Sequence, residues 1–313
     1  MHIHFHGNCQ SSMFRKTMAE IGGDFRFTSR EVHAINIKTQ MAAYEEEIRT
    51  ADVIFSQPVN ANYRDEPRLS TNWIKENRKG GSKLFIFVPL YFSAYFPQLG
   101  YLPSQESLRM PYFDFNICIL YAAGYTPAQA AEIITSEDFY DKGFIEAEVS
   151  RAIEELRRRE EVAGADIKVS ALIESNYRSR LLFFTLNHPA RALAVLVANE
   201  ICKLLNMDQR IADFGAEYLD DIVVSPYPSA AKAIDFETHV DTNIVRGGRK
   251  NFTRTDYVQQ VFSYYDEKIG KSEMGRLVLE NRDSGAYFGR YAKWPAHNHS
   301  LLSSLLESNA FSR

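Results

Sequence analysis

The first ninety residues alternate between short apolar runs and helical stretches, and this alternation limits the fold most strongly. The apolar runs predict strands at Met1–His6, Val32–Ile37, Ala51–Gln57 and Lys83–Val88. The stretches between them predict helices at Ser11–Ile21, Met41–Arg49 and Ser70–Arg78. Continuous apolar strands separated by helices are typical of a parallel sheet covered on both faces. We therefore predict an α/β fold with a short parallel sheet in the N-terminal half, compatible with a flavodoxin-like or SGNH-like strand order.

The rest of the chain is predicted to be mainly helical. Helices are expected over Thr126–Ile134, Phe144–Val162, Pro189–Asn206 and Tyr257–Lys268. We accordingly divide the chain into an α/β domain, residues 1–104, and a mainly helical region, residues 105–313, packed on it or forming one domain with it.

Composition excludes several classes of protein. The chain has 313 residues, of which 45% are hydrophobic and 24% charged, which suits a globular core. Its net charge of −4 argues against a nucleic-acid binder. No apolar stretch suits a membrane span or a signal peptide, so a cytoplasmic location is expected. The 3 cysteines form neither a disulfide framework nor a zinc-binding spacing.

The sequence Gly7-Asn8-Cys9-Gln10 stands where the first strand turns into the first helix. Unpaired N–H groups and the positive dipole end at a helix N-terminus lower a thiol pKa, which would make Cys9 a nucleophile. Gly7 permits the tight turn, and the amides of Asn8 and Gln10 could orient a substrate or donate to an oxyanion. The alternative is a buried, unreactive cysteine, which is the commoner case for a lone cysteine.

Several polar residues are expected at one edge of the sheet. Ligands of such sheets bind beyond the carboxyl ends of the strands. Cys9, Gln57 and the segment that begins at Pro89 all follow strands at that edge.

His188 is the second candidate catalytic residue. Asn187-His188-Pro189 precedes an apolar helix, with Pro189 predicted at its first position and Asn187 or His188 as its cap. The helix dipole would keep the imidazole neutral, as a general base requires, and the fold would bring it to Cys9. Alternatively, His188 only caps the helix.

The alternating histidines His2, His4 and His6 would share one face of the first strand. They could contact a metal ion, but a packed or hydrogen-bonded strand face is the preferred interpretation, and we expect no metal.

Five motifs in the same order resemble the WcbI-type polysaccharide-biosynthesis proteins, acetyltransferases that bind coenzyme A. They are Gly7-Asn8-Cys9-Gln10, Ala51–Pro58 with Tyr63-Arg64, Val88–Pro97, Leu120–Tyr125 and Thr185–Pro189. The resemblance covers about residues 3–205. One departure is Phe96, where the pattern would have a histidine.

The resemblance implies acetyl transfer from acetyl-CoA to a sugar hydroxyl in capsular or other polysaccharide biosynthesis. Cys9 would carry the acetyl group with His188 relaying protons, or His188 would activate the hydroxyl directly. Four residues are assigned to the oxyanion or to positioning, namely Asn8, Gln10, Gln57 and Asn187. Six are assigned to coenzyme A, namely Gly7, Arg15, Arg64, Tyr91, Arg246 and Arg249.

One alternative for the basic residues and two for the whole protein remain open. The basic residues Arg246, Arg249, Lys250 and Arg254 around Gly247-Gly248 could form only an exposed loop. The whole protein could instead be a cysteine-dependent SGNH-like esterase or thioesterase, or a non-catalytic carbohydrate- or nucleotide-binding protein.

Overall fold

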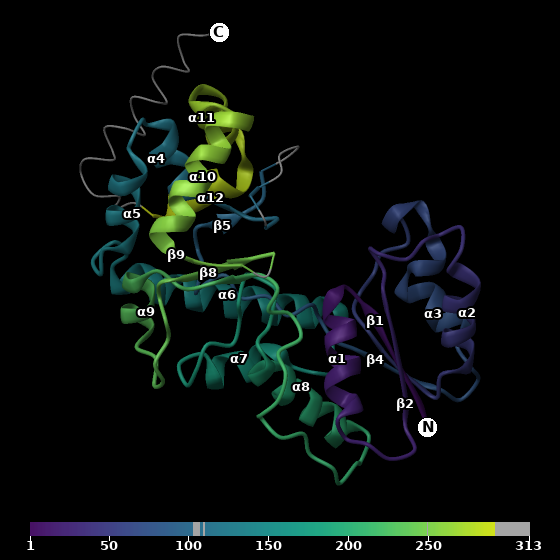
Figure 1. Cartoon of the computed structure of the whole chain (residues 1–313). Coiled ribbons are helices and arrows are strands. Elements are labelled where there is room, and N and C mark those ends of the chain that lie inside the picture. Colours follow the sequence, from purple (N-terminus) through teal and green to yellow (C-terminus); the bar gives the residue numbers. More distant parts are fainter. Residues whose placement is uncertain (103–106, 109, 249, 292–313) are drawn as a thin grey trace. The chain divides into compact units, whose positions relative to one another are not determined.

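A computed structural model describes residues 1–102, 107–108, 110–248 and 250–291 (Figure 1). They form two compact units. Unit 1 contains residues 1–92, 151–177 and 181–220, and unit 2 contains residues 93–150, 178–180 and the described residues from 221 onward. The units therefore differ from the predicted division at residue 104, because segments late in the chain complete unit 1.

Unit 1 contains a parallel sheet with the strand order β2-β1-β3-β4. The strands are β1 (His2–Gly7), β2 (Arg26–Glu31), β3 (Val53–Ser56) and β4 (Lys83–Ile86). Phe5 of β1 pairs with Ser29 of β2 on one side and with Phe55 of β3 on the other. This is the flavodoxin-like order, and the prediction of an α/β fold with a short N-terminal parallel sheet is confirmed.

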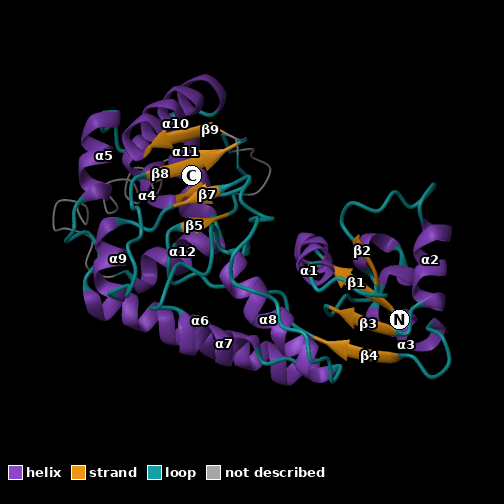
Figure 2. Cartoon of the chain, turned by 60° about the horizontal axis from the view of Figure 1, so that its bottom comes forward, coloured by secondary structure: helices purple, strands orange, loops and turns teal. Residues whose placement is uncertain are grey.

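Helices cover both faces of this sheet (Figure 2). Helix α1 (Cys9–Ala19) lies on one face, with α8 (Arg191–Leu204) packed against α1. Helices α2 (Met41–Thr50) and α3 (Thr71–Asn77) lie on the other. The Phe5 ring lies 6.3 Å from Phe14 of α1 and 5.5 Å from Phe55. Because side chains alternate along a strand, the histidines of β1 face α2.

The position of the second strand was predicted wrongly. The strand is Arg26–Glu31, whereas Val32–Ile37 was expected. Strand β2 lies at the sheet edge, and its side chains are exposed or half-buried, so its sequence lacks a continuous apolar run. Val32 and Ile35 are buried just beyond the strand, and Ile35 joins the core between the sheet, α2 and α3. Val32 and Ile35 are apolar because they are buried, although neither belongs to a strand, and this apolar pattern led to the wrong strand prediction.

The three histidines of β1 pack and form hydrogen bonds, as the preferred interpretation predicted. His2 Nε2 and His4 Nδ1 each lie 2.8 Å from Thr28 Oγ1, and His6 Nδ1 lies 3.0 Å from Ser56 Oγ. Burial lowers the pKa of His4 well below its usual value and that of His6 to about 4. His4 is therefore neutral near pH 7, and the Glu47 carboxylate 3.7 Å from its Nδ1 forms a polar contact rather than an ion pair.

We expect these histidines to make the fold acid-sensitive. His6 binds its proton only near pH 4 in the folded chain, but near pH 6.5 once unfolded, so stability is lost as pH falls from 6.5 to 4. The loss from His6 alone is roughly 3 kcal/mol at 1.36 kcal/mol per pKa unit. Urea unfolding at several pH values measures it, with His6→Gln expected to flatten the profile and the exposed His33→Gln to leave it unchanged. An unchanged profile in His6→Gln would contradict the assignment.

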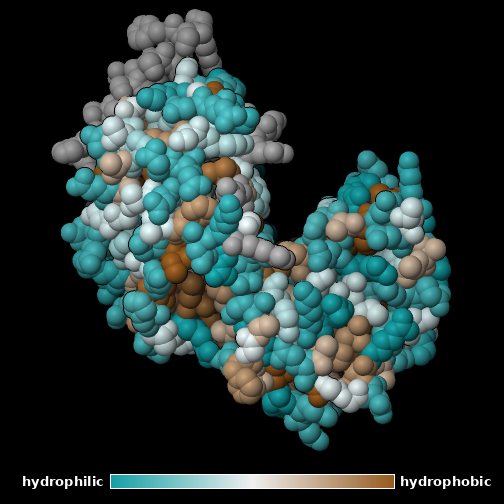
Figure 3. Space-filling view, viewed as in Figure 1, coloured by the Kyte–Doolittle hydropathy of each residue, from teal (hydrophilic) through white to brown (hydrophobic). Residues whose placement is uncertain are grey.

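The rest of unit 1 consists of short and helical elements. They are the 3₁₀ helices Tyr63–Asp65 and Pro67–Leu69, α7 (Val169–Asn176) and the second part of α6 (Lys142–Ala163). The face of α2 and α3 visible in Figure 3 is mainly hydrophilic.

Unit 2 is built largely from helices, as predicted for the C-terminal half. They are the start of α6 with α4 (Phe115–Ala122), α5 (Pro127–Thr135), α9 (Pro228–Ile234), α10 (Arg254–Lys268), α11 (Lys271–Glu280) and α12 (Arg282–Arg290). Two small antiparallel sheets were not predicted. One pairs β5 (Leu99–Gly100) with β6 (Phe113–Asp114), and the other joins β7 (Val223–Val224), β8 (Ile244–Gly247) and β9 (Lys250–Thr253).

A polar cluster lies inside unit 2. Asp114 accepts hydrogen bonds from the Tyr227 hydroxyl at 2.8 and 2.9 Å, and the Arg254 guanidinium carbon lies 4.9 Å from the centre of the Tyr227 ring. Burial raises the pKa of Asp114 to about 6. Because all three side chains are buried, we interpret this cluster as structural.

None of the helices in the described residues is both long enough and apolar enough to cross a membrane.

Candidate active site

The turn between β1 and α1 is held by Asn8, the N-cap residue of α1. Its Oδ1 accepts a hydrogen bond from Gln10 N at 2.9 Å, and its carbonyl accepts one from Ser11 N at 2.9 Å. Cys9 is the first residue of α1 and is half-buried. Within the described residues, the Asn8 side-chain NH2 has no acceptor, and the Cys9 backbone N–H interacts only with the thiol of its own residue. The turn therefore offers two hydrogen-bond donors beside the thiol.

Gln10 connects three segments that are distant in the sequence. Its Nε2 donates to the carbonyls of Leu90 and Asn187, both at 2.8 Å. Its Oε1 accepts from Leu90 N at 2.9 Å and from Gln57 Nε2 at 3.0 Å. The side chain is fully buried, and these bonds use both donors and both acceptor positions of the amide. Gln10 therefore positions segments and has no hydrogen left to donate to an oxyanion.

Gln57, at the end of β3, extends this network to the Cys9 turn. Its Oε1 accepts a hydrogen bond from Asn8 N at 2.8 Å, and its side chain is buried. Gly7 permits this contact, because a Cβ at position 7 would lie 2.9 Å from Gln57 Cγ and closer still to the amide. Gln10 and Gln57 therefore form a hydrogen-bonded pair beyond the ends of β1 and β3, at the switch point where the strand order reverses.

Gly7→Ala is expected to destabilise the protein by about 1–3 kcal/mol. The added methyl group would displace the Gln57 side chain and leave Asn8 N without its acceptor. Urea unfolding measures the loss. The matched variant Gly80→Ala adds a methyl group into open space and is expected to change stability by less than about 0.5 kcal/mol. Equal effects of the two substitutions would refute the steric explanation.

The sequence-based prediction for the Cys9 thiol was wrong in direction. Burial, with a smaller contribution from the Glu31 carboxylate, raises its pKa to about 11. The N–H groups of Cys9 and Gln10 act the other way but are outweighed. The thiol is therefore protonated near pH 7, and a base must take its proton before or during any attack.

We expect alkylation of Cys9 by iodoacetamide to be slow at pH 7 and to accelerate about tenfold per pH unit up to about pH 10. The two other cysteines are fully buried and provide an internal comparison in a mass-spectrometric time course. Cys9→Ser, which has no thiol at position 9, is the negative control. A rate that levels off near pH 7 would mean that the thiol is already ionised there and would contradict the raised pKa.

His188 lies in a turn that precedes α8 and does not cap it. The helix begins at Arg191 with Ala190 as its N-cap, so the predicted helix start at Pro189 is corrected. Phe184 N donates to the His188 carbonyl and Ala190 N to the Leu182 carbonyl, each at 2.8 Å, which keeps this stretch extended. The dipole argument for a neutral imidazole therefore no longer applies. His188 itself is half-buried.

The Asn187-His188 turn is nevertheless held near Cys9. The Asn187 carbonyl accepts the hydrogen bond from Gln10, whose sequence neighbour is Cys9. The preceding Leu186 carbonyl accepts from Phe92 N at 2.8 Å. Two segments separated by 177 positions are thus joined by one buried amide.

Arg191 fixes the start of α8 to α1. Its guanidinium binds Glu20 in a bidentate pair at 2.6 and 2.7 Å, and its backbone N donates to the Glu217 carboxylate at 2.6 Å. The side chain of Arg191 is only 4% exposed. Sequence reasoning missed this residue, although an arginine at the start of a strongly apolar helix is a recognisable signal for a buried ion pair.

Glu31 was also missed. It ends β2 and carries the negative charge that contributes to the raised pKa of Cys9. The misplaced second strand hid it, because Glu31 then preceded a strand instead of ending one.

The residues assigned to coenzyme A lie in different surroundings. Arg15, on α1, is half-buried and makes no hydrogen bond or ion pair with other described residues. Arg64 is exposed, and its Nη1 donates to the carbonyls of Val32 and Ile35 at 2.9 and 2.8 Å. The Arg159 guanidinium carbon lies 5.5 Å from the centre of the Tyr91 ring. The Arg15 guanidinium is therefore available to bind an anionic group of a ligand.

The predicted basic cluster is not one surface group. Arg254 is buried and donates to the carbonyls of Ser225 and Thr242, at 2.7 and 2.8 Å. Arg246 lies on β8 of unit 2, where its Nε donates to Asn251 at 2.8 Å. Arg249 lies outside the described residues.

No group of three or more His, Cys, Asp or Glu side chains within the described ranges is arranged to hold a metal ion.

The fold and the turn define an α/β protein with a cysteine at the switch point of a flavodoxin-like sheet. Residues 2–210 match the family model of WcbI, described as a polysaccharide biosynthesis enzyme. The chain belongs to this family of polysaccharide biosynthesis enzymes.

A solved structure of WcbI is similar to this chain in fold. It aligns with a TM-score of 0.76 at 20% sequence identity and covers 92% of this chain and 98% of that one. It is described as the native protein without a disulfide bond between coenzyme A and a cysteine. No protein of curated function matches the chain by sequence.

Proposed function

We propose that the protein is an O-acetyltransferase that moves an acetyl group from acetyl-CoA to a sugar hydroxyl during the synthesis of a capsular or other polysaccharide. Family membership supports a role in polysaccharide biosynthesis. The description of the related WcbI structure supports coenzyme A as the co-substrate, because it names coenzyme A and a disulfide bond with a cysteine that this form of the protein lacks. A cytoplasmic location would give access to acetyl-CoA.

The observation that carries the proposal is the Gln10 bridge. A fully buried amide ties the Cys9 turn to the turn that contains His188. Acyl transfer to a hydroxyl needs a base and donors for the oxyanion, and we propose that these two turns supply both, while the sugar supplies the nucleophile.

In the proposed reaction, His188 removes the proton of the sugar hydroxyl while its oxygen attacks the acetyl carbonyl. A C–O bond forms, and the carbonyl oxygen becomes an oxyanion held by Asn8 Nδ2 and the Cys9 N–H. The intermediate then collapses as the C–S bond breaks, and the thiolate of coenzyme A takes the proton from the His188 imidazolium. The products are the acetyl ester and free coenzyme A.

The raised pKa of Cys9 favours this direct route over an acetyl-cysteine intermediate. With a pKa of about 11, about one thiol in ten thousand is ionised at pH 7. In this route the Cys9 thiol lies beside the thioester of acetyl-CoA, where a small and weakly hydrated thiol packs well against the sulfur atom. Asn187 and Gln57 hold this arrangement, and Arg15, Arg64, Tyr91 and Gly7 are proposed to accommodate coenzyme A.

Calorimetric titration with coenzyme A and acetyl-CoA tests the first part of the proposal. Micromolar or tighter binding is expected for the wild type, Cys9→Ser and His188→Ala. Release of free coenzyme A from acetyl-CoA, measured with and without sugars, tests the second part. Release that needs a sugar acceptor supports transfer, whereas release with water alone indicates a thioesterase. The absence of binding would refute a coenzyme A-dependent enzyme.

A further inference from the structure

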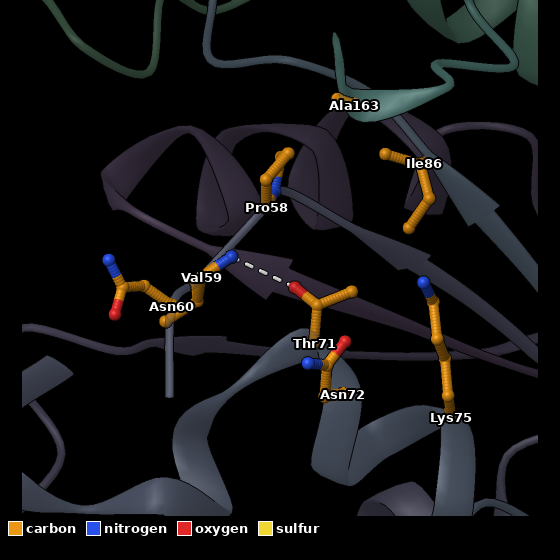
Figure 4. Close-up of a pocket in the computed structure, with 8 residues that line it drawn as sticks. All are labelled: Pro58, Val59, Asn60, Thr71, Asn72, Lys75, Ile86 and Ala163. Carbon is orange, nitrogen blue, oxygen red and sulfur yellow. Dashed lines mark hydrogen bonds between the residues drawn. The ribbon is translucent and has the colours of Figure 1, made fainter. Parts of the chain in front are cut away.

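A pocket of about 410 Å³ opens beside the carboxyl ends of β3 and β4 (Figure 4). Pro58, Val59 and Ile86 supply aliphatic surface, and Asn60, Asn72 and Lys75 supply polar groups. All of these residues belong to unit 1. The volume lies within the range of small-molecule sites, about 300–1,000 Å³.

The pocket adjoins the glutamine network of the active site. Pro58 directly follows Gln57, whose Oε1 accepts from Asn8 N. Thr71, on the wall of the pocket, donates through its Oγ1 to the Gln57 carbonyl at 3.1 Å and accepts from Val59 N at 2.8 Å. A ligand bound here would therefore lie next to the residues that support the Cys9 turn.

Lys75 gives the pocket a positive charge that no group of the described chain neutralises. It is exposed and makes no hydrogen bond or ion pair with another described residue. The next lysine along, Lys79, is by contrast paired with Asp52 at 2.6 Å. In Figure 4 the Lys75 side chain extends from α3 along the pocket toward Ile86. An ammonium in this position favours a carboxylate or a phosphate.

The other groups indicate a sugar. The amides of Asn60 and Asn72 can each donate to and accept from hydroxyls, and the aliphatic side chains offer a surface for the C–H face of a ring. The pocket has no aromatic lining residue for stacking an adenine. We propose that this pocket binds the acceptor as a sugar that carries an anionic group, with its carboxylate or phosphate on Lys75, an inference that rests on the proposed transferase function.

Binding of matched sugars to the full chain tests the proposal without any turnover. Glucuronate and glucose 6-phosphate carry the two anionic groups, and glucose is their neutral counterpart. Ligand-observed NMR titration is expected to show both acidic sugars binding at least about tenfold more tightly than glucose. The tighter of the two identifies the anionic group that the pocket prefers.

Lys75→Gln is expected to remove this tenfold preference, while Lys38→Gln, at an exposed lysine that does not line the pocket, keeps it. Equal binding of glucose and glucuronate to the wild type, or an unchanged preference in Lys75→Gln, would overturn the proposal. So would weaker binding of coenzyme A in Lys75→Gln, because the pocket would then belong to the co-substrate.

The titration with coenzyme A separates the two proposals. If coenzyme A does not bind but the Lys75-dependent preference remains, the transferase proposal fails and the anionic sugar site stands. If coenzyme A binds but the preference is absent, the anionic sugar site fails and the transferase proposal stands.

Discussion

His188→Ala is expected to slow acetyl transfer by about 10²–10⁴-fold, the range measured when a general base is removed. The loss should appear in kcat, since the imidazole acts on the hydroxyl proton in the transition state. The affinity for coenzyme A should stay within about twofold of the wild type, because His188 is assigned to the acceptor side. The measurement is acceptor-dependent release of coenzyme A, combined with calorimetry.

His33→Ala is the matched control, because this exposed histidine follows β2 and takes no part in the proposed reaction. It is expected to leave kcat unchanged. Equal losses in the two variants would point to a general effect of removing an imidazole. Full activity of His188→Ala would refute the general-base assignment and leave the thiol of Cys9 as the group to examine.

Gln10→Ala is expected to reduce the free energy of unfolding by about 3 kcal/mol or more. Truncation removes the hydrogen-bond partner of Leu90 N, Leu90 O and Gln57 Nε2 in a buried site, at roughly 1–3 kcal/mol for each group that water cannot reach. The turn that carries His188 loses its connection to α1 at the same time. We therefore expect transfer activity to fall by at least about 100-fold, since a misplacement of about 1 Å can cost that much.

Gln10→Glu separates the donating half of the bridge from the accepting half. A carboxylate can still accept from Leu90 N and Gln57 Nε2 but cannot donate to the carbonyls of Leu90 and Asn187. It should lose activity as Gln10→Ala does. Ser12→Ala, which removes only a long hydroxyl contact of 3.4 Å on the same helix, should be close to wild type in urea unfolding and in activity. Wild-type activity in Gln10→Glu would exclude the bridge as a determinant of the site.

Much of the fold could be predicted because its strands and helices carry strong local patterns. The runs around Val53–Ser56 and Lys83–Ile86 are apolar and end near prolines, so β3 and β4 were recognised. Helix α5 was also recognised, since Thr126 caps it and forms a capping box with Gln129. The position of β2 was predicted wrongly, because this edge strand is partly exposed to solvent and its sequence therefore lacks a continuous apolar run.

The local geometry around the candidate site could be predicted only where it depends on neighbouring residues in the sequence. The strand–turn–helix position of Cys9 follows from the order of elements along the chain, whereas the strand order β2-β1-β3-β4, which puts this turn at the switch point of the sheet, comes from the structure. The cap at Asn8 is a local feature as well. The hydrogen bonds of Gln10 to Leu90 and Asn187 could not be read from any local pattern, because they join residues 80 and 177 positions apart.

The sequence by itself determined the parallel α/β sheet, the turn at Cys9 and the family, since these depend on periodicity and on short motifs. Only the tertiary structure decided the protonation state of the thiol, the conformation of the His188 turn and the pocket at Lys75. Burial raises the pKa of Cys9, although the helix N-terminus acts to lower it. Residues 188–190 form hydrogen bonds with residues 182–184 as in a strand pair, so α8 begins only at Arg191. Desolvation and long-range hydrogen bonding depend on which segments meet, so no local pattern encodes them.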